Sequence, residues 1–270
     1  MVPMALTLGF SPCPNDTFIF HGIVSGQLPL PGVDLDIRLH DVETLNEMAF
    51  REVLDVTKLS FYTWLKVRHN YRLLSSGGAL GYGCGPVVVS AKPVCAEEMA
   101  ICRIVLPGQW TTAHLLFQLW APKAHQKQFV SYDRIFDALN RGHADCGVII
   151  HESRFTFEQL GFRAIADLGA WWEKQTGLPI PLGCIAAHKR LPRDLVQNLE
   201  TRIRQSIVAA RTNPGQALPF IRTHAQELTL DVLQAHIDTF VNDFSLDLGS
   251  KGQAAVSALE KQAREAGIIP

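Results

Sequence analysis

Short apolar runs alternate with amphipathic segments along the first two-thirds of the chain. The runs have the length of strands, and they are either continuously apolar or alternate with a period of two. They predict strands at 5–10, 33–40, 54–60, 86–91, 102–107, 145–151, 162–169 and 181–189. The segments between them carry apolar residues at helical spacing and predict helices at 17–26, 43–51, 61–71, 111–120 and 132–142.

From Pro192 onward the pattern changes to helices alone. The segments 193–211, 217–225, 230–242 and 252–266 all carry apolar residues at helical spacing. Strands that alternate with helices are typical of α/β proteins, in which helices connect neighbouring parallel strands. The pattern therefore predicts an α/β fold with mostly parallel sheets and flanking helices.

Two stretches rich in glycine and proline divide the alternating region. They are "GGALGYGCGP" at 77–86 and "TGLPIPLG" at 176–183, and such stretches favour turns and chain crossings. We expect a larger, discontinuous lobe of residues 1–90 and 186–270 and a smaller inserted lobe of residues 91–185. A cleft would lie between the lobes, and two hinge strands would join them.

The composition narrows the classes of partner. With 47% apolar residues, 19% charged residues and a net charge of −1, the chain resembles ordinary soluble proteins. Without a basic excess, we expect neither nucleic acid nor a membrane surface as a partner. No Lys or Arg precedes Arg38, so the basic region of a signal peptide is missing. Six cysteines without a C-x-x-C pair favour reduced thiols, and we expect a cytoplasmic protein.

Polar, turn-forming residues follow four of the predicted strands. They are "SPCPND" and "KLS" in the first lobe and "GQWTTA" and "HES" in the second. Ligands of open α/β sheets bind outside the carboxyl ends of the strands. Helix N-termini suit a carboxylate because they offer free N–H groups and a positive dipole end, and Lys58 beside Ser60 adds a full charge. The sequence predicts a cleft for a small anionic ligand.

Several of these polar residues have a second interpretation as helix caps. Asn15 or Asp16 either accepts a hydrogen bond at the start of the following helix or lines the cleft. The same two interpretations apply to Ser60 and to Thr111 or Thr112.

His151 and Cys13 are the candidate reactive residues. His151 ends an apolar strand, and an imidazole at a cleft edge can act as a general base, although a histidine there can also simply bind loop backbone. Cys13 precedes a helix, which favours a nucleophilic thiolate, but no particular histidine pairs with it. We therefore assign the chemistry to His151 and keep Cys13 as the weaker candidate.

Other known motifs are missing. The glycine-rich stretch at 77–86 lacks the G-x-G-x-x-G order and precedes a strand, so it does not predict a dinucleotide site. The chain has no P-loop, no H-E-x-x-H and no G-x-S-x-G motif. Trp171 and Trp172 either form the floor of an aromatic pocket or pack in the core.

A set of ordered motifs resembles one enzyme family. The motifs are "SPCPNDTFIF", "DVETLN", "TKLS", "SGGALGYGCGP", "TTA", "IIHESRFT", "DLGAWWE", "TGLPIPLG" and "FSLDLG". Together they resemble 1,4-dihydroxy-6-naphthoate synthase of the futalosine route of menaquinone biosynthesis, over residues 6 to 249. The resemblance implies a two-lobed type II periplasmic-binding-protein-like fold.

The resemblance also implies a reaction and a site. The family converts cyclic dehypoxanthinylfutalosine to 1,4-dihydroxy-6-naphthoate and releases dihydroxyacetone, without a metal or another cofactor. Its proton acceptor falls on His151, and its substrate contacts fall on Lys58, Leu59, Ser60, Thr112 and Ala113. Two alternatives stay open: a related chorismate dehydratase of the same pathway, and a non-catalytic protein that binds an organic anion.

Overall fold

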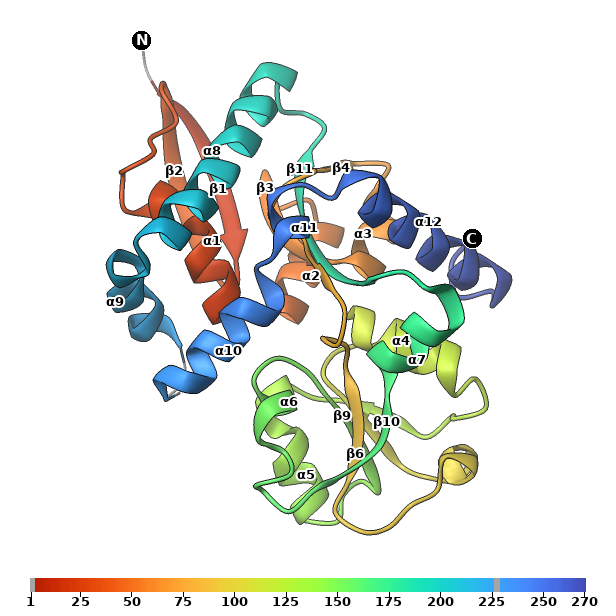
Figure 1. Ribbon diagram of the computed structural model, residues 1–270. Coiled ribbons are helices and arrows are strands. Elements are labelled where there is room, and N and C mark those ends of the chain that lie inside the picture. Colours follow the sequence, from red (N-terminus) through yellow and green to blue (C-terminus); the bar gives the residue numbers. More distant parts are fainter. Residues whose placement is uncertain (1–2, 226–228) are drawn as a thin grey trace.

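The computed structural model describes residues 3–225 and 229–270, and it contains two β-sheets with flanking helices (Figure 1). The first sheet has the order β2-β1-β3-β11-β4, with β5 also paired to β11. Its strands are β1 (Met4–Phe10), β2 (Val33–Leu39), β3 (Val56–Ser60), β4 (Tyr71–Leu73), β5 (Ala79–Gly81) and β11 (Ile180–His188). The second sheet has the order β10-β6-β9-β7-β8. Its strands are β6 (Val87–Ser90), β7 (Ile104–Leu106), β8 (Lys127–Phe129), β9 (Cys146–Ile149) and β10 (Arg163–Asp167).

The helices follow the predicted order. The helices before β6 and after β11 are α1 (Pro14–Val24), α2 (Val42–Phe50), α3 (Phe61–Val67), α8 (Arg193–Thr212), α9 (Pro214–His224), α10 (Leu230–Phe240), α11 (Asp243–Leu246) and α12 (Gly249–Glu265). Those between β7 and β11 are α4 (Thr112–Trp120), α5 (Ile135–Asn140), α6 (Ser153–Thr156) and α7 (Leu168–Thr176). Short 3-10 turns lie at η1 (Ala96–Ala100) and η2 (Tyr132–Arg134). The α/β class and the helical C-terminal region are confirmed.

The elements that the sequence pattern missed are mostly short. The strands β4, β5 and β8 have three residues each, which is too few for a hydrophobic period to be recognised. Helix α7 begins inside the predicted strand 162–169, because the Asp167 side chain accepts from the Gly169 and Ala170 amides and starts a helix there. Trp172 of this helix is fully buried and donates to the Pro179 carbonyl at 3.0 Å, so it packs in the core.

The expectation of mostly parallel sheets is wrong. In the first sheet β11 runs antiparallel to β3, β4 and β5, and in the second sheet β6 runs antiparallel to β9 and β10. Parallel pairing is confined to β1 with β2 and β3, and to β7 with β8 and β9. Strands β6 and β11 are the two strands that the chain enters directly after it changes from one sheet to the other.

The chain passes between the two sheets twice. It leaves the first sheet after β5 and enters the second at β6, and it returns through α7 to β11. The glycines of these passages approach each other closely, since a Cβ on Gly85 would lie 2.3 Å from the Gly169 backbone. The sheet pairing places 87–90 with the second sheet and 180–185 with the first, a few residues from the predicted lobe boundaries. The division into lobes stays a prediction.

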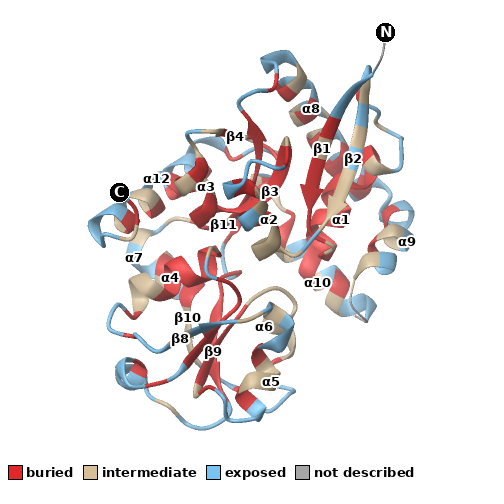
Figure 2. Cartoon of the chain, turned by 180° about the vertical axis from the view of Figure 1, so that it is seen from behind, coloured by how far each residue is buried: buried red, intermediate tan, exposed pale blue. Residues whose placement is uncertain are grey.

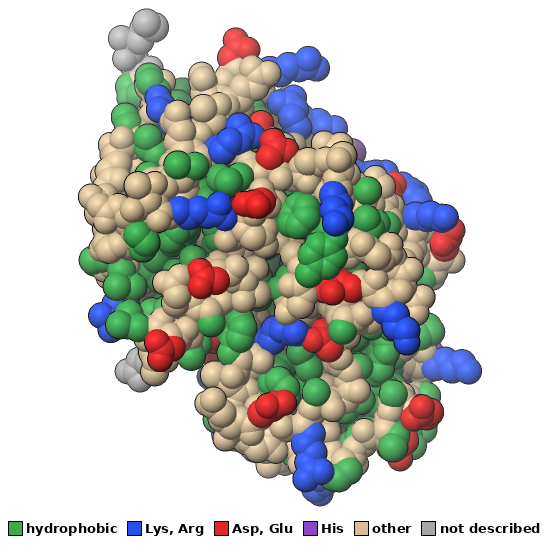
Figure 3. Space-filling model, viewed as in Figure 1, with side chains coloured by type: hydrophobic (Ala, Val, Ile, Leu, Met, Phe, Trp, Pro, Cys, Tyr) green, Lys and Arg blue, Asp and Glu red, His purple; other side chains and the backbone are tan. Residues whose placement is uncertain are grey.

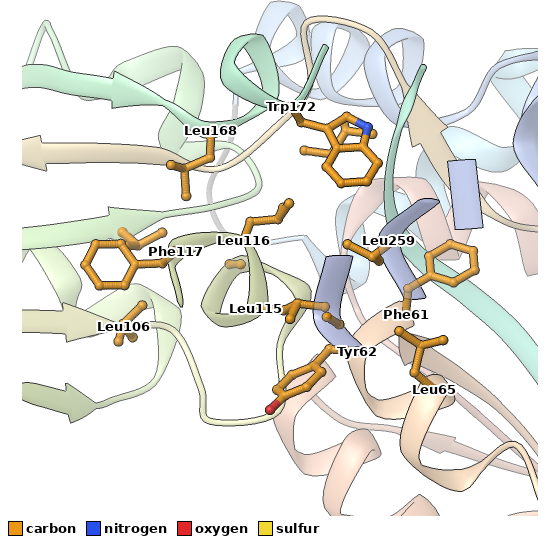
Figure 4. Packing of buried hydrophobic residues seen from close by; sticks show 14 of the residues in the cluster. Phe61, Tyr62, Leu65, Leu106, Leu115, Leu116, Phe117, Leu168, Trp172 and Leu259 are labelled. Carbon is orange, nitrogen blue, oxygen red and sulfur yellow. The ribbon is translucent and has the colours of Figure 1, made fainter. Parts of the chain in front are cut away.

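One hydrophobic cluster joins the two sheets. It includes Phe61 and Leu65 of α3, Leu116 of α4, Trp172 of α7 and Leu259 of α12, all buried (Figure 4). Seen from behind, the buried positions gather on the strands and on the inner faces of the helices, and the outer faces are exposed (Figure 2). Among the described residues, no helix is long and apolar enough to cross a membrane. The hydrophobic cluster of α3, α4, α7 and α12 packs the two sheets against each other.

Candidate active site

A pocket lies where the strand ends of the two sheets meet. The nine residues that the sequence assigned to the cleft all line it, namely Asn15, Asp16, Lys58, Leu59, Ser60, Thr111, Thr112, Ala113 and His151, whereas Cys13 is not among its lining residues. They come from the first turn of α1, the end of β3, the N-cap and first turn of α4, and the segment that follows β9. The structure thus brings the four predicted loops together, while the role of each residue stays a prediction.

Lys58 and Asp16 form a buried ion pair in the wall of this pocket. Lys58 Nζ lies 2.7 Å from Asp16 Oδ1 and also donates to the Gly77 carbonyl at 3.2 Å. The other carboxylate oxygen of Asp16 accepts from the Ser11 hydroxyl at 2.7 Å. The ammonium has three N–H donors, so one remains for a ligand. The Lys58 charge is therefore already balanced, which the sequence pattern did not indicate.

Asn15 links this pair to a second histidine. The Asn15 amide donates to Asp16 Oδ1 at 2.9 Å, and Asn15 Oδ1 lies 2.9 Å from His236 Nε2. Because the Asn15 oxygen can only accept, His236 must carry its proton on Nε2. His236 belongs to α10, is fully buried, and gave no signal in the sequence because it lies within a helical pattern.

His151 follows β9 in a left-handed backbone conformation with φ of 56°. Such a conformation is uncommon outside glycine and is found at functional sites where the surrounding structure enforces it. The ring lies edge-on to Tyr132, with 5.2 Å between centroids, and lines the pocket. Burial lowers the pKa of His151 below its ordinary value of 6.5, and the Glu152 and Asp16 carboxylates offset part of this effect. The ring is therefore neutral at pH 7, which is the state that a base requires.

The structure argues against Cys13 as a nucleophile. Burial raises the pKa of the Cys13 thiol far above its ordinary range, and the nearby Glu152 carboxylate acts in the same direction. A thiol in that state is not a thiolate near neutral pH. Cys13 is instead the N-cap residue of α1, which begins at Pro14. The interpretation of Asn15 or Asp16 as the N-cap is therefore wrong, since both lie in the first turn.

The other two capping interpretations have different outcomes. Thr111 is the N-cap of α4, and its hydroxyl accepts from the His114 amide at 3.2 Å. Ser60 occupies the N-cap position of α3 but makes no capping bond. Its amide donates to Asn46 Oδ1 at 3.0 Å, and its hydroxyl oxygen accepts from Asn46 Nδ2 at 3.2 Å. The Ser60 hydroxyl proton is not used in this contact, so the group can still donate to another acceptor.

Thr112 uses its hydroxyl within the protein. The group donates to the Leu182 carbonyl at 2.7 Å and accepts from the Tyr62 amide at 3.3 Å. Its backbone amide and that of Ala113 are the first two of α4, and no acceptor in the described part of the chain pairs with them. Two free amides at a helix N-terminus suit a carboxylate or another oxyanion.

The sequence reasoning missed several residues of the pocket. Arg154 lies in the wall, where it donates to the Gly85 carbonyl at 2.6 Å and to Asp167 Oδ2 at 2.6 Å. The apolar part of the wall includes Leu182 and Phe240. Arg154 was visible in the motif "IIHESRFT", whereas Phe240 lies in a helix far along the chain.

The donors and the neutral base suggest what the pocket can do. It offers N–H and O–H donors to an anionic or hydroxyl-rich ligand, apolar surface to a ring, and one neutral imidazole to remove a proton.

Within residues 3–225 and 229–270, no three His, Cys, Asp or Glu side chains are grouped so as to hold a metal ion. The visible outer face carries charges of both signs without a large patch of either (Figure 3).

Sequence comparisons identify close relatives. The profile of a family described as menaquinone biosynthesis matches residues 6–265. A protein of Thermus thermophilus named 1,4-dihydroxy-6-naphtoate synthase is 47% identical over 264 residues, which cover 98% of this chain and 96% of that protein. A protein of Streptomyces coelicolor with the same name is 37% identical over 270 residues, with 98% and 95% covered.

Solved structures with a similar fold include binding proteins. A protein of Archaeoglobus fulgidus has a TM-score of 0.93 at 29% identity, with 98% of each chain covered. The periplasmic aliphatic sulphonate binding protein of Escherichia coli has a TM-score of 0.68 at 13% identity, with 99% of this chain and 89% of that chain covered. A Candida albicans protein described as having the generic periplasmic binding protein fold has a TM-score of 0.74 at 12% identity, with 98% and 90% covered. These likenesses confirm the predicted periplasmic-binding-protein-like fold.

Proposed function

The chain belongs to the menaquinone biosynthesis family of the 1,4-dihydroxy-6-naphthoate synthases, and we propose that it converts cyclic dehypoxanthinylfutalosine to 1,4-dihydroxy-6-naphthoate with release of dihydroxyacetone. The observation that carries the proposal is the neutral His151 in the same pocket wall as the Lys58–Asp16 pair and the α4 amides. This combination supplies a base beside donors for an anionic substrate.

In the proposed reaction, His151 removes a proton from the substrate. A carbon–carbon bond then breaks, the departing three-carbon fragment takes back a proton from the His151 imidazolium and leaves as dihydroxyacetone, and the remaining ring becomes aromatic. The reaction is an elimination without net oxidation, so it needs no redox cofactor. The positive charge that forms on His151 is stabilised by the carboxylates of Glu152 and Asp16 nearby, which favour the protonated ring.

We assign the substrate carboxylate and hydroxyls to three groups of donors. They are the third N–H of Lys58, the Ser60 hydroxyl, and the backbone amides of Thr112 and Ala113. Each of these lines the pocket. Leu59 lies between Lys58 and Ser60 in β3 and also lines the pocket. A ligand held by both β3 and α4 would bring the two sheets together over it, and closure of the two predicted lobes would exclude water from the reactive intermediate.

A turnover assay tests the proposal. The purified protein is given cyclic dehypoxanthinylfutalosine, and chromatography follows the appearance of the naphthoate and of dihydroxyacetone. We expect turnover by the wild type, a loss of about a hundredfold or more for His151→Ala, and wild-type rates for His143→Ala, which alters an exposed histidine of the second sheet's loops. A His151→Ala variant as fast as the wild type would refute the base assignment.

The same assay separates the alternatives. Consumption of chorismate without activity on the cyclic substrate would assign the protein to the related dehydratase reaction. A ligand that stabilises the protein against heat but is recovered unchanged would assign a binding role, as the fold of the sulphonate binding protein allows. We place the reaction in the cytoplasm, which the six free cysteines favour.

A further inference from the structure

Helix α2 lies behind the pocket and carries two polar side chains on one face. Asp41 caps this helix by accepting from the Glu43 and Thr44 amides. Glu43 and Asn46 are three residues apart and therefore neighbours on the helix surface. Asn46 Nδ2 donates to Glu43 Oε2 at 3.3 Å. Both residues belong to the motif "DVETLN", and neither lines the pocket.

Asn46 holds the substrate-binding segment of the first sheet. Its Oδ1 accepts from the Ser60 amide at 3.0 Å, and its Nδ2 donates to Ser60 Oγ at 3.2 Å. Asn46 and Ser60 are both buried, and Asn46 is fully so. These two bonds fix the Ser60 backbone and leave its hydroxyl proton directed away from Asn46.

Glu43 holds the loop that precedes α4, on the other side of the pocket. The Trp110 amide donates to both of its carboxylate oxygens, at 3.0 and 3.1 Å. The loop fits closely around the carboxylate, since a Cβ on Gly108 would lie 2.6 Å from it. At the far end of α2, Phe50 packs on the Trp110 ring with 4.8 Å between centroids. Trp110 stands directly before Thr111 and the two free amides of α4.

We propose that Glu43 and Asn46 are positioning residues that fix the two substrate-contacting segments, 58–60 and 108–113, relative to each other across the pocket. The contacts run from one helix face to both segments through the Asn46–Ser60 and Glu43–Trp110 bonds. Neither residue touches the substrate. The inference rests on the proposed function for the identity of the substrate, but not for the contacts themselves.

The proposal predicts a particular kinetic signature for Glu43→Gln. The variant keeps the shape of the side chain but removes the charge and one of the two acceptors for the Trp110 amide. We expect KM for the cyclic substrate to rise about tenfold, because one charge-assisted bond is lost, while kcat changes less than about twofold. A change confined to KM indicates that substrate binding is weakened, whereas loss of a catalytic group lowers kcat.

Amide hydrogen exchange measures the same contact without substrate. Mass spectrometry of the substrate-free protein follows the peptide that covers 108–113, and we expect faster exchange there in Glu43→Gln than in the wild type. Glu47→Gln is the matched control, since Glu47 lies on the same helix, is exposed, and forms an ion pair with Arg51 at 3.9 Å on the helix surface. Gly108→Ala is a second variant that disturbs the contact from the loop side, and we expect the same two effects.

The outcomes separate this inference from the proposed function. If the wild type does not act on the cyclic substrate, the exchange experiment still tests the contacts. Unchanged exchange at 108–113 in Glu43→Gln and Gly108→Ala would overturn the inference. Faster exchange with an unchanged KM would also overturn it, because the contact would then be purely structural. A fall in kcat at constant KM would overturn it by making Glu43 a catalytic residue.

Discussion

The ring of His236 stacks parallel to the ring of His151, with 6.0 Å between centroids and 4° between planes. His236 donates from Nε2 to Asn15, so its Nδ1 lone pair has no hydrogen-bond partner in the described chain and lies 3.8 Å from the Glu152 carboxylate. Burial lowers the pKa of His236 well below its ordinary value of 6.5, and His151 and Lys58 lower it further. The proposed base therefore has a second, neutral histidine as its neighbour.

The pH dependence of turnover reports on His151. Its pKa lies below 6.5, and the proposed base must be neutral to act. We expect kcat/KM to stay constant as the pH falls from 8 to 6.5, and to decline only at lower pH. The measurement is a pH–rate profile at substrate concentrations below KM. A decline that is already complete at pH 7 would contradict the assignment.

Stability should fall as the medium becomes acidic, and His236 should contribute to the fall. Below pH 6.5 the unfolded chain binds a proton at this residue while the folded protein does not, since the folded pKa is lowered. Each histidine of this kind lowers the free energy of unfolding by about 1.4 kcal/mol for every pH unit of acidification in this range. The pKa of His114, lowered to about 4, acts in the same way. Urea unfolding at pH 7, 6 and 5 measures the slope.

The variant His236→Gln isolates this contribution. A glutamine amide can still donate to Asn15 but does not titrate. We expect its unfolding free energy to fall less steeply between pH 6.5 and 5 than that of the wild type. Equal slopes for the two proteins would show that His236 does not titrate differently in the folded and unfolded states.

Removing the partner of Lys58 should be costly. Lys58 is 4% exposed, so Asp16→Asn leaves a buried ammonium without its carboxylate. We expect a loss of about 3–5 kcal/mol in unfolding free energy, measured by denaturant titration. The matched control is Asp36→Asn, which breaks a half-exposed pair with Arg38 at 2.7 Å and should cost less than about 1 kcal/mol. Similar losses for both variants would refute the burial argument.

The close approach of the two passages between the sheets can be tested at Gly85. A Cβ there would lie 2.3 Å from backbone atoms of Gly169, and backbone cannot move aside as a flexible side chain can. We expect overpacking in Gly85→Ala to reduce the free energy of unfolding by about 1–3 kcal/mol, which is measured as a lower melting temperature. Gly215→Ala, whose Cβ would meet nothing closer than 3.9 Å, should leave stability unchanged or slightly raised. A neutral Gly85→Ala would mean that the passages can separate.

The sequence by itself located the main strands and helices and nine of the residues that line the pocket. The period of two or of 3.6 located the main strands and helices, because each buries one face against the same core. The ends of four strands gave the pocket loops, and all nine predicted residues line one pocket. Local patterns suffice for these features because strand ends and helix starts have their own residue preferences.

Only the tertiary structure decided how these residues are paired. The sequence did not show that Asp16 balances Lys58, that Glu43 holds Trp110, or that His236 stacks on His151. It also predicted the wrong direction for the pairings of β6 and β11. Partners that lie tens or hundreds of residues apart are set by how the two sheets pack and by which groups burial forces to find a partner. A local sequence pattern therefore does not show which distant residues become partners.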